Sequence, residues 1–427
     1  MNKDTDTTNQ EKKLSPAGQE IPKIDKIRNF LMEHYDFRFN DIMQTLEYKE
    51  KADPFFVPFT DKLKRDIVIR LKQQRFSKPN DDLDDILNSS LIPNFNPIQE
   101  YFDCLEFSGY GHVKRLGRCI KLNRPDMIIG GKPYQQLFDD FFERWLMACY
   151  LCVTGKSIND AMLILIGQQG QFKTTFLNYL TPNALIDYRV CTNINPSLTD
   201  YNTANFLTEK FFINVDDQME KIFGKDYNSM KSIISAPDVT SRKLYRSNHQ
   251  RRRRIANFCG SVNESRFLRD SNNRRYLCFA VADISSDYQE IDINAVWAEI
   301  KRKVEAQNKI YIFGKEDYVM IDLMNNQYEA PTEEAETLQS LFMPVVGEPD
   351  PNKYVYWMSF TEILKLIRGH AGNNQLKSYN LQTAMRKYGY TPQAVRKERF
   401  GMQPRNLYAV QPLTNDPALL TYLIEYK

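Results

Sequence analysis

Apolar residues recur at helical spacing through the first third of the chain. Residues 22–90 predict helices joined by polar turns, because apolar positions in KIRNFLMEHYDF and TDKLKRDIVIRLKQQ fall on one helix face. Residues 133–153 predict a long apolar helix that ends near Gly155. Residues 1–20 are polar and predict a disordered tail. The pattern therefore predicts a helical N-terminal domain over residues 21–155, without a catalytic constellation of its own.

After this helix the pattern changes to short apolar runs, which are typical of buried strands. A helical segment, INAVWAEIKRKVEAQ, follows them. The sequence thus predicts an α/β core over residues 156–330. The predicted strands are Ala161 to Ile166, Phe211 to Val215, Ile255 to Val262 and Tyr276 to Val281.

The pattern changes again near residue 338, where a third domain, residues 338–427, is predicted. SFTEILKLIRG predicts a helix that begins at Ser359 or Thr361, and SYNLQTAMRKYGY predicts a second helix. PQAVRKERFGMQPRNLYAV predicts a hairpin with Gly401 near its turn. Two helices followed by two strands is the order of a winged-helix domain. Its many Lys and Arg residues favour a phosphate-binding surface, with protein contacts as the alternative.

Composition and charge narrow the class of protein. A chain of 427 residues exceeds one ordinary core, so several domains are expected. The formal net charge is only +3, so any affinity for nucleic acid must come from local patches. No apolar run reaches the ~18 residues of a membrane span, and the first residues contain no apolar signal segment. With seven scattered cysteines, we expect a cytoplasmic protein without a membrane partner.

A glycine-bearing loop follows the first predicted strand and precedes a helix. Its sequence, GQQGQFKTT, resembles the phosphate-binding pattern G-x-x-x-x-G-K-[ST], although Phe172 replaces the second glycine. In such a loop, Lys173 would contact the β- and γ-phosphates of ATP and Thr174 would offer a hydroxyl to Mg²⁺. An ordinary strand–turn–helix with a surface lysine is the alternative. The candidate nucleotide-binding residues are Gly167, Gln168, Gln169, Gly170, Gln171, Phe172, Lys173, Thr174 and Thr175.

Carboxylates and an amide follow the next predicted strands. Asp216 and Asp217 come directly after the second strand, where one can hold Mg²⁺ and the other can orient an attacking water. We assign the metal to Asp216 and the base to Asp217, with Glu220 as the reserve base. A helix N-cap pair is the alternative. Asn263 follows the third strand, from which it can reach the γ-phosphate or the lytic water.

Two arginine-containing segments complete the candidate chemistry. Residues 239–254, VTSRKLYRSNHQRRRR, predict a basic β-hairpin with a polar tip that can track phosphates. A solvated charge run, or arginines that pair with acids of a neighbouring subunit, is the alternative. Arg274 and Arg275 precede the fourth strand, and an arginine there can cross to a neighbour's nucleotide as a finger.

Several segments together resemble one known family in order and spacing: GQQGQFKTTFLNYL, FFINVDD, MKSIISAPDVTSRKLYR, RRRRIANFCGSVNE, FLRD and NNRRYLCFAV. The similarity is to the virulence-associated E family of phages and mobile elements, over about residues 95–285. The P-loop core of that family resembles superfamily 3 helicases and the poxvirus primase-helicase ATPases. The resemblance implies an AAA+-like fold, assembly into a ring and translocation on DNA.

Individual roles follow from the resemblance by position. Lys173 and Thr174 correspond to the Walker A motif, and Asp216 and Asp217 to Walker B. Asn263 corresponds to sensor 1. The finger or sensor arginine corresponds to Arg274 or Arg275, and the pore hairpin that contacts DNA corresponds to Lys243, Arg246 and His249.

These features lead to one leading hypothesis and two alternatives. The leading one is an ATP- and Mg²⁺-dependent DNA helicase or translocase of a mobile element, which acts in replication as a homo-oligomeric ring, expected to be a hexamer. Its substrate would be single-stranded or forked DNA, and a separate primase is a further candidate partner. The first alternative is a nucleotide-dependent switch or defence ATPase with a protein partner. The second is a non-catalytic DNA-binding replication initiator with a degenerate P-loop.

Overall fold

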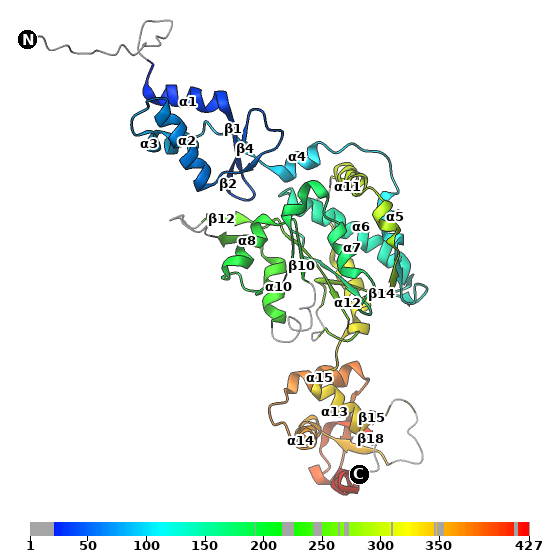
Figure 1. Ribbon diagram of the computed structural model, residues 1–427. Coiled ribbons are helices and arrows are strands. Elements are labelled where there is room, and N and C mark those ends of the chain that lie inside the picture. The colour runs from blue at the N-terminus through cyan, green and yellow to red at the C-terminus, as the bar shows by residue number, and fades with distance from the viewer. Residues whose placement is uncertain are drawn as a thin grey trace, which may run out of the picture.

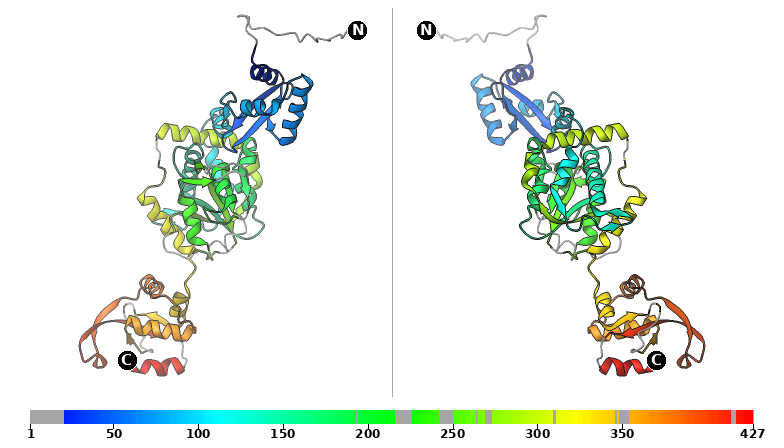
Figure 2. Two further views of the ribbon diagram at one scale, coloured as in Figure 1. Left: turned by 90° about the vertical axis from the view of Figure 1, so that its left-hand side faces the viewer. Right: turned by 90° about the vertical axis from the view of Figure 1, so that its right-hand side faces the viewer.

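The structure is a computed structural model of mixed α/β class, in which three parts follow one another along its length (Figures 1 and 2). We call them the N-terminal lobe (residues 21–96), the central core (97–330) and the C-terminal domain (331–426). The structure describes residues 21–192, 194–215, 226–241, 250–263, 265–268, 273–308, 311–345, 347, 354–413 and 417–426.

The N-terminal lobe combines three helices with a four-stranded sheet, in the order β3-β2-β1-β4. Strands β1 and β2 are antiparallel, and β4 runs parallel to β1. A separate apolar cluster of the lobe packs the helices on this sheet. The elements are α1 (Lys23–His34), β1 (Tyr35–Asn40), β2 (Thr45–Glu50), β3 (Val57–Pro58), α2 (Asp61–Gln73), α3 (Pro79–Leu87) and β4 (Asn94–Phe95).

The prediction of an all-helical N-terminal region is therefore wrong. The segment KIRNFLMEHYDF changes from helix to strand between His34 and Tyr35. Tyr35 and Phe37 are buried two residues apart, which is the period of a strand. Neither glycine nor proline marks this junction, so local sequence does not reveal it.

The central core contains a six-stranded sheet in the order β5-β14-β8-β13-β10-β9. Strands β14, β8, β13, β10 and β9 are parallel, and β5 is antiparallel to β14. The small hairpin β6–β7 and the two-stranded ribbon β11–β12 lie outside this sheet.

The helices are α4 (Pro97–Asp103), α5 (His112–Arg118), α6 (Tyr134–Val153), α7 (Lys173–Tyr179), α8 (Tyr201–Glu209), α10 (Tyr227–Ser235), α11 (Ile293–Gln307) and α12 (Lys315–Asn325), with 3₁₀ helices η1 (Asn183–Tyr188), η2 (Ser286–Glu290) and η3 (Asn326–Tyr328). The strands are β5 (Ile120–Leu122), β6 (Ile128–Ile129), β7 (Lys132–Pro133), β8 (Met162–Ile166), β9 (Arg189–Cys191), β10 (Phe212–Val215), β11 (Asp238–Ser241), β12 (Gln250–Arg253), β13 (Asn257–Val262) and β14 (Tyr276–Ile284).

Helices cover both faces of this sheet, which explains why β8 is apolar at every position. Leu163 and Leu165 belong to the apolar cluster that includes α6, α7 and α11. Met162, Ile164 and Ile166 belong to the cluster on the other face, with α8 and α10. Helix α6 was predicted from its apolar pattern, and the structure confirms it. Because α6 packs on the sheet, the expected boundary between domains at residues 155 and 156 falls inside one packed unit.

The C-terminal domain contains the predicted order of two helices and a hairpin. Ser359 begins α14 through a capping box: Glu362 N donates to Ser359 Oγ at 3.3 Å, and Ser359 N donates to Glu362 Oε2 at 2.7 Å. A further helix, α13, packs against α14 and α15. The elements are α13 (Glu333–Leu341), β15 (Phe342–Pro344), β16 (Tyr356–Met358), α14 (Phe360–Ala371), α15 (Ser378–Lys387), β17 (Pro392–Arg396), η4 (Glu398–Phe400), β18 (Pro404–Pro412), α16 (Pro417–Leu423) and η5 (Ile424–Tyr426).

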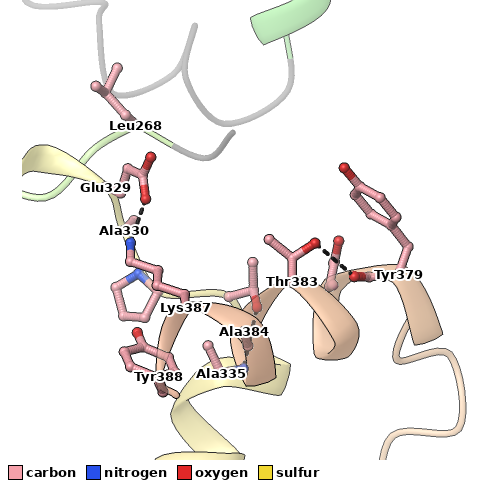
Figure 3. A pocket seen from close by; sticks show the side chains of 12 residues that line it. Leu268, Glu329, Ala330, Ala335, Tyr379, Thr383, Ala384, Lys387 and Tyr388 are labelled. Carbon is pink, nitrogen blue, oxygen red and sulfur yellow. Dashed lines mark hydrogen bonds and ion pairs between the residues drawn. The ribbon is translucent and has the colours of Figure 1, made fainter. Parts of the chain in front are cut away.

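A small cavity of about 90 Å³ lies where the C-terminal domain joins the core (Figure 3). Leu268 and Glu329 of the core line one side, and Tyr379 and Thr383 of α15 line the other. Lys387, at the end of α15, forms an ion pair with Glu329. In the described parts of the chain, no helix combines the length and the hydropathy of a transmembrane segment.

Candidate functional site

The loop that follows β8 emerges at the carboxyl end of the parallel strands. Gly167 N donates to Val262 O of β13 at 3.0 Å, so the loop begins beside the end of that strand. A Cβ atom on Gly167 would lie 2.8 Å from Val281 O and 2.1 Å from Gln171 Oε1. The close backbone approach therefore requires glycine at this position.

The Gln171 side chain connects the loop to the sheet. Its Nε2 donates to Ala282 O at 2.7 Å, which ties the loop to β14. The sequence pattern does not reveal this contact, because it depends on the strand order. The loop thus contacts both strands that flank β8, through Val262 and through Ala282.

Phe172 occupies the position where the phosphate-loop pattern has glycine. Its backbone is left-handed, with φ 55° and ψ 18°, a conformation that glycine adopts without steric cost. The phenyl ring is 62% exposed, so little packing accompanies this conformation. Helix α7 begins at the next residue, and Phe176 N donates to Phe172 O at 2.9 Å. The backbone therefore adopts a glycine-type turn at residue 172 without a glycine.

Lys173 is the buried charge of this loop, with 5% of its surface exposed. Its ammonium donates to Gly167 O at 2.8 Å and to Gln168 O at 2.6 Å. It also lies 3.4 Å from Asn263 Oδ1, directly beyond the end of β13. The structure thus brings together Lys173 and Asn263, which are ninety residues apart in the sequence. A positive charge and an amide beside an open loop can hold an anion and polarise it.

Asn214 is a site residue that sequence reasoning missed. It lies in β10, is 1% exposed, and its Nδ2 donates to Asn178 Oδ1 of α7 at 3.0 Å. The same Nδ2 lies 3.5 Å from Thr174 O. Its Oδ1 is buried without a hydrogen-bond partner within the described part of the chain. A polar residue inside the apolar run FFINV was the available signal, because buried amides require partners.

The two aspartates predicted to hold the metal and the water, Asp216 and Asp217, lie outside the described residues, as does Glu220. Strand β10 ends at Val215, which pairs with Gly260 of β13 near the carboxyl end of the sheet. Where the chain is described, no three His, Cys, Asp or Glu side chains come together as a metal site. Mg²⁺ coordination by Thr174 and Asp216 therefore stays a prediction.

Arg274 and Arg275 lie at the opposite end of the sheet from Lys173. Arg275 O accepts a hydrogen bond from Met162 N at 2.8 Å, at the start of β8, whereas the loop follows the end of β8. The intervening strand is about 13 Å long. The Arg275 side chain donates to Ser235 Oγ at 2.6 Å, and Arg274 lies over the Tyr318 ring at 4.9 Å. Within one chain these arginines are therefore separate from Lys173 and Asn263.

The predicted basic hairpin is present as β11 and β12, and its tip, with Lys243, Arg246 and His249, lies outside the described residues. The side chains of Arg251 to Arg254 alternate between the exposed and the inward face of the chain, because successive residues of a strand point to opposite faces. Arg251 is exposed and pairs with Asp238 at 2.7 Å. Arg254 is fully buried, and its guanidinium donates to the carbonyls of Ala236, Ala256 and Asn159. Two of the four consecutive arginines, Arg252 and Arg254, thus form contacts inside the fold, and the expected contact of the hairpin with phosphates stays a prediction.

Comparison with family models gives a match for the middle of the chain. Residues 128–330 match the virulence-associated protein E-like domain. This segment contains the phosphate-loop segment, β10, β13 and the basic hairpin, and it overlaps the resemblance over about residues 95–285. The helix α6 lies inside the matched virulence-associated protein E-like domain as well. A comparison with curated proteins gives no match.

Comparison with solved structures gives matches that include the C-terminal region of NrS-1 in its apo form. That structure has 12% sequence identity and a TM-score of 0.49, and the match covers 92% of this chain and 99% of the other. A second structure, the A form of the same region, has 11% identity and a TM-score of 0.46, and the match covers 90% and 98% of the two chains.

Proposed function

We propose that the chain is an ATP-dependent DNA helicase or translocase of a mobile element, which acts in replication as a ring of identical subunits. The observation that carries this proposal is the contact between the buried Lys173 ammonium and Asn263 at the carboxyl end of two adjacent parallel strands. In open α/β sheets, ligands bind at this end of the strands. The match to the virulence-associated protein E-like domain supports the same reading.

The strand order supports an AAA+-like core. Strand β13 lies between β8, which precedes the loop, and β10, which precedes the two aspartates. Asn263 directly follows β13, and the resemblance to the virulence-associated E family gives this position the role of the sensor residue. The distance along the sheet between Lys173 and the two arginines supports action of Arg274 or Arg275 on a neighbouring subunit's nucleotide.

The residues of the loop fit ATP with Mg²⁺. The Lys173 ammonium donates to Gly167 O and Gln168 O and lies 3.4 Å from Asn263 Oδ1, and in the proposed complex it would also contact the β- and γ-phosphates. Thr174 and Asp216 would hold Mg²⁺, and Asp217 would orient the water. The metal and Lys173 would spread the charge that develops on the transferred phosphoryl group.

For the C-terminal domain we propose a winged-helix role in loading DNA. Two helices are followed by the β17–β18 hairpin, and several exposed Lys and Arg residues lie on these elements. The basic hairpin β11–β12 would contact DNA through Lys243, Arg246 and His249. Single-stranded or forked DNA is the proposed substrate.

The deciding experiment is steady-state ATP hydrolysis with and without single-stranded DNA. Wild type is compared with Lys173→Ala and with Lys72→Ala, which removes an exposed lysine of α2 as a matched control. Turnover that rises with DNA, disappears in Lys173→Ala and persists in Lys72→Ala supports the motor. Unchanged turnover in Lys173→Ala overturns the site assignment.

The remaining outcomes select the alternatives. Turnover that does not respond to DNA supports a switch or defence ATPase with a protein partner. Nucleotide binding without turnover supports a DNA-binding replication initiator. Mass measurement of the protein with ATP and Mg²⁺ tests the ring, since a monomer under these conditions contradicts it.

A further inference from the structure

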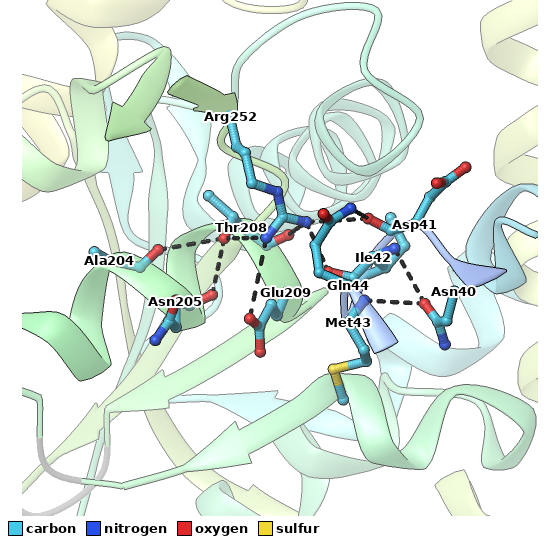
Figure 4. Close-up of polar contacts among 10 residues, drawn as sticks. All are labelled: Asn40, Asp41, Ile42, Met43, Gln44, Ala204, Asn205, Thr208, Glu209 and Arg252. Carbon is cyan, nitrogen blue, oxygen red and sulfur yellow. Dashed lines mark hydrogen bonds and ion pairs between the residues drawn. The ribbon is translucent and has the colours of Figure 1, made fainter. Parts of the chain in front are cut away.

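The second inward-facing arginine of the basic hairpin, Arg252, connects two parts of the molecule (Figure 4). It donates to Ile42 O at 2.7 Å and to Asp41 O at 3.1 Å, in the turn between β1 and β2 of the N-terminal lobe. It also donates to Thr208 Oγ1 at 3.1 Å and lies 3.4 Å from Thr208 O, at the end of α8. The side chain is 15% exposed, and Glu209 Oε1 lies 4.0 Å from its Nη1.

Both ends of this contact are built rigidly. On the hairpin side, Arg252 is paired across the ribbon with Val239, which is buried in the core cluster. On the lobe side, Asn40 shapes the turn, since Asn40 Oδ1 accepts hydrogen bonds from Ile42 N at 3.0 Å and Met43 N at 2.9 Å. Asn40 Nδ2 donates to Tyr188 Oη of the core at 2.8 Å. The lobe therefore presents fixed carbonyl oxygens to a fixed guanidinium.

The contact between residue 252 and the β1–β2 turn favours arginine over lysine. The arginine Nη2 donates to Ile42 O and Asp41 O of the lobe while its Nη1 donates to Thr208 Oγ1 of α8, and a single ammonium does not reproduce these two coplanar donor groups. Burial lowers the pKa of Arg252, while the nearby Glu209 and Asp41 raise it. Loss of the guanidinium would remove a donor from the partly buried Ile42 O and Asp41 O, which weakens the contact between the lobe and the hairpin.

We infer that Arg252 is a positioning residue for DNA binding: it joins the β1–β2 turn of the N-terminal lobe to the β11–β12 ribbon, and so makes the response of the ATPase to DNA depend on the lobe. This inference rests on the proposed function, because it assumes that the hairpin contacts DNA. The lobe is then not a separate accessory domain. A change in its β1–β2 turn alters the response of the ATPase to DNA, although the turn is about two hundred residues away in sequence.

The test compares three variants of the full chain with two matched controls. Arg252→Met removes the donors and keeps the bulk, and Arg252→Lys keeps the charge but not the fork. Asn40→Ala disrupts the turn from the other side without any change of charge. The controls are Arg70→Lys, whose contacts with Tyr35 and Glu50 lie within the lobe, and Asn88→Ala, which donates to Asp84 O there.

Two readouts are measured on each protein. The first is hydrogen exchange of the β1–β2 turn and of β11 and β12, which we expect to accelerate at least about tenfold in Arg252→Met and Asn40→Ala but not in the controls. The second is the concentration of single-stranded oligo(dT) that gives half-maximal stimulation of ATP turnover. We expect it to rise about tenfold in both variants, with a smaller rise in Arg252→Lys.

The outcomes are distinguishable. Faster exchange with an unchanged DNA response overturns the inference, because Arg252 is then structural only. Unchanged exchange in Arg252→Met overturns it as well. A wild-type ATPase that does not respond to DNA contradicts the proposed function and the role of Arg252 in it, while the exchange result still decides whether Arg252 holds the lobe to the hairpin.

Discussion

Lys173 Nζ lies 3.4 Å from Asn263 Oδ1, so the charge of the loop meets the first residue after the neighbouring strand. This distance is long for a hydrogen bond, and such catalytic contacts often tighten when the ligand binds. Asn263→Ala should therefore reduce ATP turnover roughly 10²-fold, as expected for loss of one placed polar group. Nucleotide binding should fall only a few-fold, in contrast to Lys173→Ala.

Turnover and nucleotide titration of the two variants check this prediction. Asn88→Ala, at an exposed asparagine of the N-terminal lobe, is the control. Equal loss of binding in both variants would mean that Asn263 only supports Lys173. Full turnover in Asn263→Ala would mean that Asn263 takes no part in ATP hydrolysis.

Replacement of either loop glycine, Gly167 or Gly170, by alanine should reduce the stability of the protein, for a different reason at each position. At Gly167 a Cβ meets Val281 O and Gln171 Oε1, so Gly167→Ala should displace the loop and cost about 1–3 kcal/mol of stability. At Gly170, with φ +87°, nothing lies within 4 Å, so Gly170→Ala should cost only the backbone strain of about 1 kcal/mol.

Nucleotide affinity separates the two variants, because only Gly167→Ala should move the backbone around Lys173. Isothermal titration with a non-hydrolysable ATP analogue measures this. Adding Gln171→Ala to Gly167→Ala should restore affinity only in part, since the contact with Val281 O remains and the hydrogen bond from Gln171 to Ala282 O is lost. Equal affinities of Gly167→Ala and wild type would contradict the steric account.

Phe172→Gly should slightly stabilise the protein. The left-handed conformation costs a residue with a Cβ roughly 1–2 kcal/mol, and the greater freedom of glycine in the unfolded chain offsets roughly 0.5–1 kcal/mol of that. Since the ring is 62% exposed, little buried area is lost. We expect the free energy of unfolding to rise by up to about 1 kcal/mol, as measured by denaturant titration.

The control is Phe107→Gly, which removes another exposed phenylalanine, one that packs against Tyr110 and has no left-handed backbone. This variant should lose stability. A loss of the same size in Phe172→Gly would mean that the ring at residue 172 makes a stabilising contact.

The pattern of apolar and polar residues predicted those helices and strands that local periodicity determines. Helices α6 and α11 match the predicted segments closely, and the order of helices and hairpin in the C-terminal domain was also predicted. The β1–β2 hairpin was missed because its first strand continues a helical segment without a breaker.

The candidate site could be predicted only where a residue belongs to a motif or directly follows an apolar run. The motif predicted a role for the segment around Lys173, and the position after a strand predicted one for Asn263; the structure brings these two side chains within 3.4 Å of each other. In contrast, Arg252 and Arg254 cannot be told from Arg251 and Arg253 in the run RRRR, since only the register of β11 and β12 decides which side chains turn inward. The roles of Asn214 and Gln171 depend in the same way on contacts between distant strands.

Glu334 should make the stability of the C-terminal domain depend on pH. It is 4% exposed, and its carboxylate accepts hydrogen bonds from Lys377 N at 2.7 Å and from Asn380 Nδ2, at the start of α15. Burial alone would raise its pKa, but these donors hold the pKa below the usual 4.5. Because the folded value is the lower one, this stabilisation is present above about pH 4.5 and is lost as the pH falls through the folded pKa.

Glu334→Gln should therefore weaken α15 at pH 7, by about 1–3 kcal/mol, and the difference from wild type should shrink towards pH 4 and below. Hydrogen exchange of the α15 amides, compared between the two proteins at each pH, measures this because intrinsic exchange rates cancel. Glu336→Gln alters an exposed glutamate of α13, the helix that carries Glu334, and should show no such trend. A difference that stays constant from pH 7 down to pH 3 would mean that packing of the side chain, rather than its charge, holds the start of α15.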